Sequence, residues 1–114
     1  MNADDQPALS KSALLRQLGV SERDIEDVCS QYGIKRLTVF GSAARGEMRP
    51  DSDVDLMIEY SMNVQPSLGD LAEARDAFMR LFGGRDVDLT TPSILRNPYR
   101  RKAIEREKRE LYAA

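Results

Sequence analysis

The sequence predicts an α+β fold, an α/β sandwich in which helices pack on a small mixed β-sheet of three or more strands. Three short segments with strand-like patterns, residues 35–40, 53–58 and 86–90, carry this prediction. Between and around them, apolar residues recur at helical spacing. At 114 residues the chain is long enough for one domain and too short for two ordinary ones. We therefore expect one domain over residues 1–114.

Two helices are expected ahead of the first strand, after a polar segment, residues 1–8, that we expect to be disordered. The first helix has a short leucine stripe and ends at Gly19. The second can be capped by Ser21 and ended by Gly33. Its apolar face consists of Ile25, Val28, Cys29 and Tyr32. We therefore expect Cys29 to lie in the core.

The three strands differ in what they carry. The first is rich in β-branched and aromatic residues and runs directly into Gly41. In the second, apolar residues alternate with Asp53 and Asp55, which gives one apolar face and one acidic end. The third repeats this alternation and carries Asp88 on its polar side.

A further helix is expected over residues 71–82, between the second and third strands. After the third strand the chain is expected to continue as one or two helices, with a break near Pro98. The last helix has only a thin apolar stripe, made by Ile104 and Leu111 between charged residues. We expect this helix to face solvent or a partner.

Composition argues against several classes of function. The 17 Lys plus Arg and 19 Asp plus Glu residues give a formal charge of -2, so we expect no direct nucleic-acid binding by broad phosphate neutralisation. One cysteine forms no internal disulfide, and the lack of histidine removes zinc spacings and imidazole catalysis. The acidic start is unlike a signal peptide, and no run of about 18 apolar residues exists to cross a bilayer. We expect a cytoplasmic protein that does not associate with membranes.

Residues 41–56, GSAARGEMRPDSDVDL, place a Gly-Ser turn close to two aspartates. Side chains two apart on a strand point the same way, about 6–7 Å apart, so Asp53 and Asp55 can bracket metal ions. If the third strand neighbours the second, Asp88 joins them. Hard cations such as Mg²⁺ prefer these ligands and keep positions open for phosphates. Solvated strand edges are the alternative, but aspartates are poor strand formers and their concentration here favours a metal site.

The turn itself suits a phosphate. Gly41 lets backbone N–H groups approach an anion, Ser42 adds a hydroxyl, and a helix starting there would aim its positive end at the ligand. Arg45 either contacts a phosphate or pins the loop through a nearby aspartate, and both interpretations stay open. Ser52 is a further nucleotide-binding candidate, although we favour a structural role at the start of the strand.

Together, VFGSAARGEMRPDSDVDLMI and the later VDL resemble the nucleotidyltransferase superfamily, whose pattern is an apolar strand, Gly-Ser, a spacer, Asp-x-Asp and a third acid on a later strand. The superfamily is the DNA polymerase beta-like one. Within it, the sequence looks like the minimal nucleotidyltransferases that act as antitoxins of HEPN-domain ribonuclease toxins. The similarity covers about residues 35–112. It implies the nucleotidyltransferase fold.

The resemblance also implies roles for single residues. Gly41 and Ser42 would hold the triphosphate of ATP, Asp53 and Asp55 would bind two Mg²⁺ ions, and Asp88 would be the third acid, near the second metal and the acceptor hydroxyl. The implied reaction is attack of a hydroxyl on the α-phosphorus, with AMP transferred and pyrophosphate released. In this subgroup the acceptor is a tyrosine of the HEPN toxin, so adenylylation would block RNA cleavage.

Two alternatives remain open. The chain could be an antitoxin that covers its toxin without catalysis, using the charged C-terminal helix and the loop at residues 61–69. It could instead modify a small molecule, but the acceptor pocket of such enzymes normally needs an added helical domain, for which 114 residues leave no room.

Overall fold

The computed structural model describes residues 9–114, so the expected disorder of residues 1–8 lies outside the described residues. Within these residues the chain forms one four-stranded sheet with the spatial order β3-β2-β1-β4. β1 lies antiparallel to both β2 and β4, whereas β2 and β3 run parallel. The predicted α+β class with a small mixed sheet is therefore confirmed. The strands are β1 (Ile34–Phe40), β2 (Val54–Tyr60), β3 (Val87–Thr90) and β4 (Arg109–Ala113).

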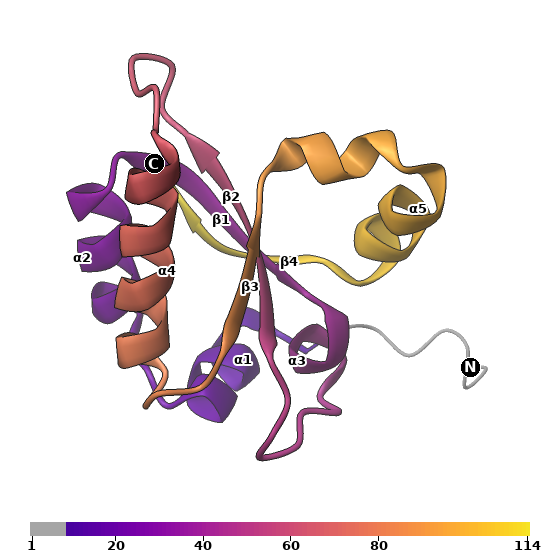
Figure 1. Ribbon diagram of the computed structural model, residues 1–114. Coiled ribbons are helices and arrows are strands. Elements are labelled where there is room, and N and C mark those ends of the chain that lie inside the picture. The colour runs from indigo at the N-terminus through magenta and orange to yellow at the C-terminus, as the bar shows by residue number, and fades with distance from the viewer. Residues whose placement is uncertain (1–8) are drawn as a thin grey trace.

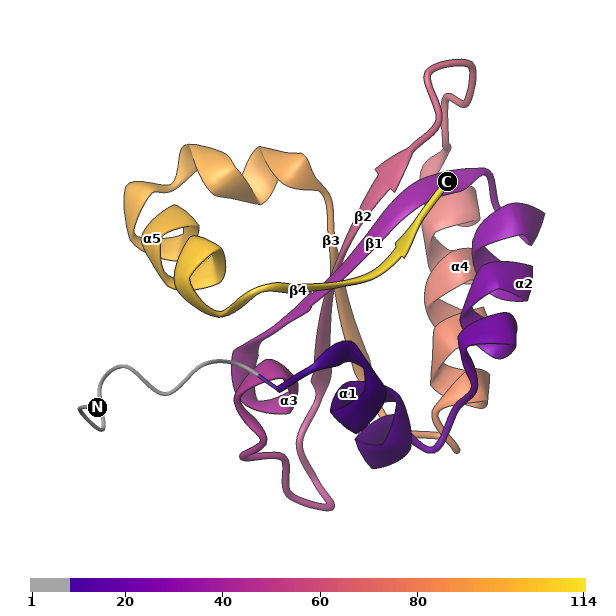
Figure 2. The same ribbon diagram turned by 180° about the vertical axis from the view of Figure 1, so that it is seen from behind.

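Helices lie on both sides of this sheet (Figure 1). α2 and α4 cover one face, and α5 with the 3-10 helix η2 covers the other, as the opposite view also shows (Figure 2). α1 and α3 lie together at one end of the sheet. The helices are α1 (Lys11–Leu18), α2 (Glu22–Gln31), α3 (Gly41–Arg45), α4 (Leu68–Leu81), η2 (Pro92–Arg96) and α5 (Pro98–Glu107).

The alternation of the strands divides the apolar residues between two cores. The larger core lies under α2 and α4 and includes Leu56, Phe78 and the fully buried Cys29, as predicted for the cysteine. Burial raises the pKa of the Cys29 thiol to about 12. The smaller core lies under α5 and consists of Phe40, Met57 and Ile104. The site described below lies on this second face.

Helix starts follow the local sequence. Ser21 and Asp24 form a reciprocal capping box at the start of α2, which confirms the predicted cap. Ser67 and Asp70 form the same motif at the start of α4. The expected break near Pro98 is also present, because η2 ends just before this residue and α5 begins at it. None of the helices in the described part of the chain has the length and apolarity that a membrane span requires.

The C-terminal segment differs from the prediction, which continues the last helix past Leu111. α5 ends at Glu107, and β4 then pairs with β1, with Val39 opposite Arg109. Ile104 packs in the smaller core, whereas Leu111 is buried in the larger one on the other face. The prediction was wrong because the spacing of Ile104 and Leu111 fits a helix, while the open edge of β1 offers backbone hydrogen bonds that a strand satisfies.

Candidate active site

The turn from β1 into α3 lies against the carboxylate of Asp55. Gly41 begins α3 with a φ of +73°, a left-handed conformation that disfavours any residue with a Cβ. The surrounding space is equally restrictive, because a Cβ on Gly41 would collide with Oδ2 of Asp55. The register explains this closeness, since Phe40 lies opposite Asp55 on the neighbouring strand. Turn and carboxylate therefore form one unit.

The parallel pairing of β2 and β3 places Asp55 beside Asp88, which are partners in the register. The prediction that the third strand neighbours the second is therefore confirmed. Asp53 directly precedes β2 and shares the side of Asp55 by strand alternation. Asp53 and Asp88 are exposed, whereas Asp55 is partly buried. All three acids thus lie on the α5 face, at the end of the sheet that carries the turn.

Asp55 is the electrostatic centre of this group. Its pKa is raised to about 6, first by burial and then by the negative charges of Asp88 and Asp53. Arg100 on α5 opposes the shift, and Glu107 adds to it. The cluster therefore concentrates negative charge that a bound cation would neutralise.

As the side chains stand, no three His, Cys, Asp or Glu residues within residues 9–114 form a group that could hold a metal ion. Asp53, Asp55 and Asp88 still fit Mg²⁺ by donor type, because they offer only hard carboxylate oxygens. Asp55 and Asp88 are partners in the strand register, so their backbone positions are adjacent. Magnesium binding by these three residues therefore stays a prediction.

Arg45 on α3 is held by two glutamates. Its Nε donates to Glu47 at 3.1 Å and its Nη1 donates to Glu107 at 2.8 Å. These contacts correspond to the pinning role that the sequence left open, although the partners are glutamates and not an aspartate. A phosphate contact by Arg45 stays a prediction.

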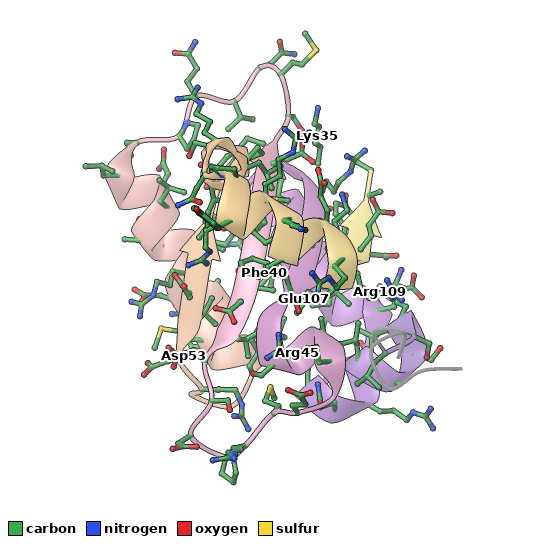
Figure 3. All side chains as sticks on the ribbon, turned by 90° about the vertical axis from the view of Figure 1, so that its right-hand side faces the viewer. Lys35, Phe40, Arg45, Asp53, Glu107 and Arg109 are labelled. Atoms are coloured by element: carbon green, nitrogen blue, oxygen red, sulfur yellow. The ribbon has the colours of Figure 1, made fainter. Side chains whose placement is uncertain are left out.

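Glu107 is the site residue that sequence reasoning missed. Its Oε1 accepts a hydrogen bond from the Gly41 N–H at 2.9 Å, while Oε2 accepts the one from Arg45. Figure 3 shows Glu107 on α5, next to Arg45. The predicted helix through Leu111 did not indicate this contact, because a continuous helix would not pair with β1 and would not place Glu107 beside Gly41. The only contrary signal was the Leu111–Tyr112 pair, which is compatible with a strand but weak beside so many helix-forming neighbours.

The two predicted serines have different surroundings. Ser42 follows Gly41 on α3 and is partly buried. The hydroxyl of Ser52 accepts a hydrogen bond from the Arg49 N–H at 2.9 Å, which closes the loop ahead of β2. Arg85 fastens the same loop through backbone carbonyls, including that of Ser52 at 3.1 Å. This matches the structural role favoured for Ser52, while nucleotide contacts by either serine stay predictions.

Carboxylates are the ligands that divalent metals use in two-metal phosphoryl and nucleotidyl transfer, and a turn without side-chain bulk leaves room for a phosphate. The chain belongs to the nucleotidyltransferase domain family, because the model of that family matches residues 22–111. The predicted family is therefore confirmed, and so is the prediction of a nucleotidyltransferase enzyme.

Individual relatives agree with this assignment. MJ1379 of Methanocaldococcus jannaschii, provisionally named a protein adenylyltransferase, is 38% identical over 77 residues, which cover 68% of this chain and 76% of that protein. The protein adenylyltransferase MntA of Thermococcus cleftensis is 35% identical over 72 residues, covering 63% and 70% of the two chains.

Solved structures share the fold. One that is provisionally described as a minimal nucleotidyltransferase matches with a TM-score of 0.62 and 28% identity, covering 86% of this chain and 93% of that one. A crystal structure of a toxin-antitoxin with AMP-PNP matches with a TM-score of 0.63 over 83% of this chain and 75% of that one. At 17% identity, this second similarity shows the fold alone.

Proposed function

We propose that this chain is an antitoxin that transfers AMP from ATP to a tyrosine hydroxyl of a HEPN-domain ribonuclease toxin, in a reaction that depends on Mg²⁺. The observation that carries the proposal is the position of Asp55, which lies against Gly41 on one side and beside Asp88 on the other. The relatives named protein adenylyltransferases support AMP transfer to a protein. The toxin-antitoxin with AMP-PNP, which shares the fold, supports a toxin partner and an adenine nucleotide.

In this proposal Asp53, Asp55 and Asp88 hold two Mg²⁺ ions. Bound there, the ions would supply Lewis-acid stabilisation of the charge that develops on the α-phosphate and the leaving oxygen. Ser42 offers its hydroxyl to the triphosphate, and Gly41 lets the phosphates approach closely because it has no side chain. These residues bind and orient the nucleotide.

The transfer itself forms one bond and breaks one. The acceptor oxygen bonds to the α-phosphorus, and the bond from that phosphorus to the oxygen bridging toward the β-phosphate breaks, so that pyrophosphate leaves with the electron pair. The hydroxyl proton needs a base, and the chain has no histidine. Asp88 is exposed on the edge strand β3, where an incoming acceptor can reach it, so we assign it this role.

Intact-mass analysis tests the proposal. The purified chain is incubated with ATP, Mg²⁺ and the protein encoded by the neighbouring gene, and this partner should gain the mass of AMP. Removal of metal with EDTA, or the double change Asp53→Asn with Asp55→Asn, should abolish the gain. Asp76→Asn, an exposed aspartate on α4, serves as the matched control and should leave it intact. A folded wild-type enzyme that adds no AMP to this partner would contradict the proposal.

A second candidate, an antitoxin that acts by binding alone, is favoured by three exposed apolar side chains. Met62, Leu68 and Tyr99 are 93%, 85% and 86% exposed. Met62 lies in the loop between β2 and α4, Leu68 is the first residue of α4, and Tyr99 lies on α5. Protection of growth from the toxin separates the two functions. Loss of Asp53 and Asp55 should abolish protection by catalysis and leave protection by binding unchanged.

A further inference from the structure

One side chain at the end of α5 connects this helix to the phosphate turn. We propose that Glu107 is a positioning residue for nucleotidyl transfer, which fixes α3 against Asp55 and thereby sets where the triphosphate lies relative to the three acids. The inference rests on the proposed function, because it concerns the same nucleotide site. It assigns a role to a residue that touches neither the nucleotide nor the acceptor in the proposed mechanism.

Each carboxylate oxygen of Glu107 accepts a different hydrogen bond. Oε1 accepts from the Gly41 N–H at 2.9 Å, and Oε2 accepts from Arg45 at 2.8 Å. The Glu107 side chain is only 16% exposed, whereas Glu47, the other partner of Arg45, is 64% exposed. Charge-assisted hydrogen bonds that are shielded from water are stronger than exposed ones. Of the two glutamates that bind Arg45, Glu107 therefore makes the stronger contact, and it is the one that also binds the backbone of the turn.

Backbone pairing, rather than a flexible loop, brings Glu107 to this place. Val39 lies opposite Arg109 in the antiparallel β1–β4 pair. Glu107 stands two residues before Arg109, and Gly41 stands two residues after Val39, so the two lie level with each other. The helix is fixed as well, because the buried Ile104 packs α5 into the smaller core. The backbone carbonyl of Ile104 also accepts a hydrogen bond from the Lys108 N–H at 2.8 Å. Strand register and helix packing together determine the position of the carboxylate.

Gly41 consequently lies between two carboxylates. Asp55 occupies the space where its Cβ would be, and Glu107 accepts its N–H. If Glu107 is lost, the turn keeps its neighbour on β2 but loses its attachment to α5, so the distance between turn and acids is no longer fixed from both sides. In a competing role, Glu107 would accept the Gly41 N–H that a phosphate would otherwise accept. Loss of Glu107 would then strengthen nucleotide binding.

Nucleotide binding and amide exchange test the proposal without an acceptor protein. The variants are Glu107→Gln, which keeps an oxygen for the Gly41 N–H, and Glu107→Ala, which removes both contacts. Glu105→Gln is the matched control, since Glu105 lies on the same helix and pairs with Arg101 at 3.1 Å on the exposed surface. Calorimetry measures the Kd of α,β-methylene-ATP with Mg²⁺, and NMR measures hydrogen exchange of the Gly41 amide.

The expected results differ between the variants. Glu107→Ala should weaken binding of the analogue about tenfold to a hundredfold, as loss of a charge-assisted hydrogen bond predicts, and should speed exchange of the Gly41 amide by a similar factor. Glu107→Gln should weaken binding less and keep the amide protected. Glu105→Gln should match the wild type. All comparisons are made well below the Tm of each variant, so that a merely structural loss leaves Kd unchanged.

Contrary results distinguish failure of the proposed function from failure of the positioning role of Glu107. A wild-type chain that does not bind the analogue refutes the proposed function, and with it the role of Glu107 in that function. A wild-type chain that binds, with unchanged affinity in both Glu107 variants, refutes the positioning role alone. Tighter binding in Glu107→Ala also refutes it, in favour of competition with the phosphates. If Glu107→Ala does not fold, the Kd of Glu107→Gln decides, because an affinity equal to that of the wild type then refutes the positioning role.

Discussion

Gly41→Ala is expected to destabilise the protein more than the same substitution at Gly83. The two glycines have nearly equal φ values, +73° and +72°, so alanine meets the same backbone strain at both. At Gly83 no atom lies within 4 Å of the place where a Cβ would be, whereas at Gly41 the Cβ would collide with Asp55. The difference between the two variants therefore isolates the contact between the turn and the carboxylate.

The magnitude follows from these two contributions. A left-handed alanine costs about 1–2 kcal/mol, of which about 0.4–1 is offset by the lower entropy of the unfolded chain. Displacing Asp55 adds roughly 1–3 kcal/mol, as overpacking does elsewhere. We thus expect a loss of about 1 kcal/mol for Gly83→Ala and about 2–4 kcal/mol for Gly41→Ala, out of a total stability of about 5–15 kcal/mol.

Urea unfolding followed by circular dichroism, in buffer without divalent metal, measures both free energies of unfolding. A double-mutant cycle adds Asp55→Ala to each glycine variant. In that background the excess cost at Gly41 should fall by about 1–2 kcal/mol, whereas the cost at Gly83 should not change. Equal losses at the two glycines, or strict additivity with Asp55→Ala, would refute the statement that turn and carboxylate form one unit.

Three further predictions concern charge and burial. The pKa of Asp55 is raised from 3.8 to about 6, so its contribution to stability is complete below pH 3.8 and is lost as the pH rises through about 6. The full shift corresponds to about 3 kcal/mol, which solvent screening of this partly exposed group reduces to about 1–2 kcal/mol. In thermal melts in EDTA at pH 7.5, Asp55→Asn should therefore be more stable than the wild type by about 1–2 kcal/mol. This difference in stability should vanish near pH 4, and Asp76→Asn should not show it. Leu111→Asp should release β4 and cost about 3–5 kcal/mol, because the side chain is only 1% exposed; fast amide exchange confined to the termini would contradict this. Cys29, with its pKa raised to about 12, should react with a thiol reagent at pH 8 only at the rate of unfolding, and immediate reaction of the folded chain would show that the core is open.

The sequence by itself determined the features that local physics controls. Strand alternation separated Asp55 from its apolar neighbours, the cap at Ser21 marked the start of α2, and the Gly-Ser step after a buried strand marked the turn. Each of these depends on residues within one or two turns of the chain, where spacing and backbone preference are sufficient. The family resemblance rested on the same local motifs, and the family match confirmed it.

Only the tertiary structure decided which distant segments meet. The parallel pairing of β2 with β3 placed Asp88 beside Asp55. From the sequence, this neighbourhood was only a condition for the three acids to lie together. The pairing of β4 with β1 turned the expected end of a helix into an edge strand and brought Glu107 to Gly41. Strand pairing is a property of two segments, because backbone hydrogen bonds are satisfied between them, so no pattern within residues 98–113 alone reveals it. The contact of Glu107 with the Gly41 turn was for this reason visible only in the fold.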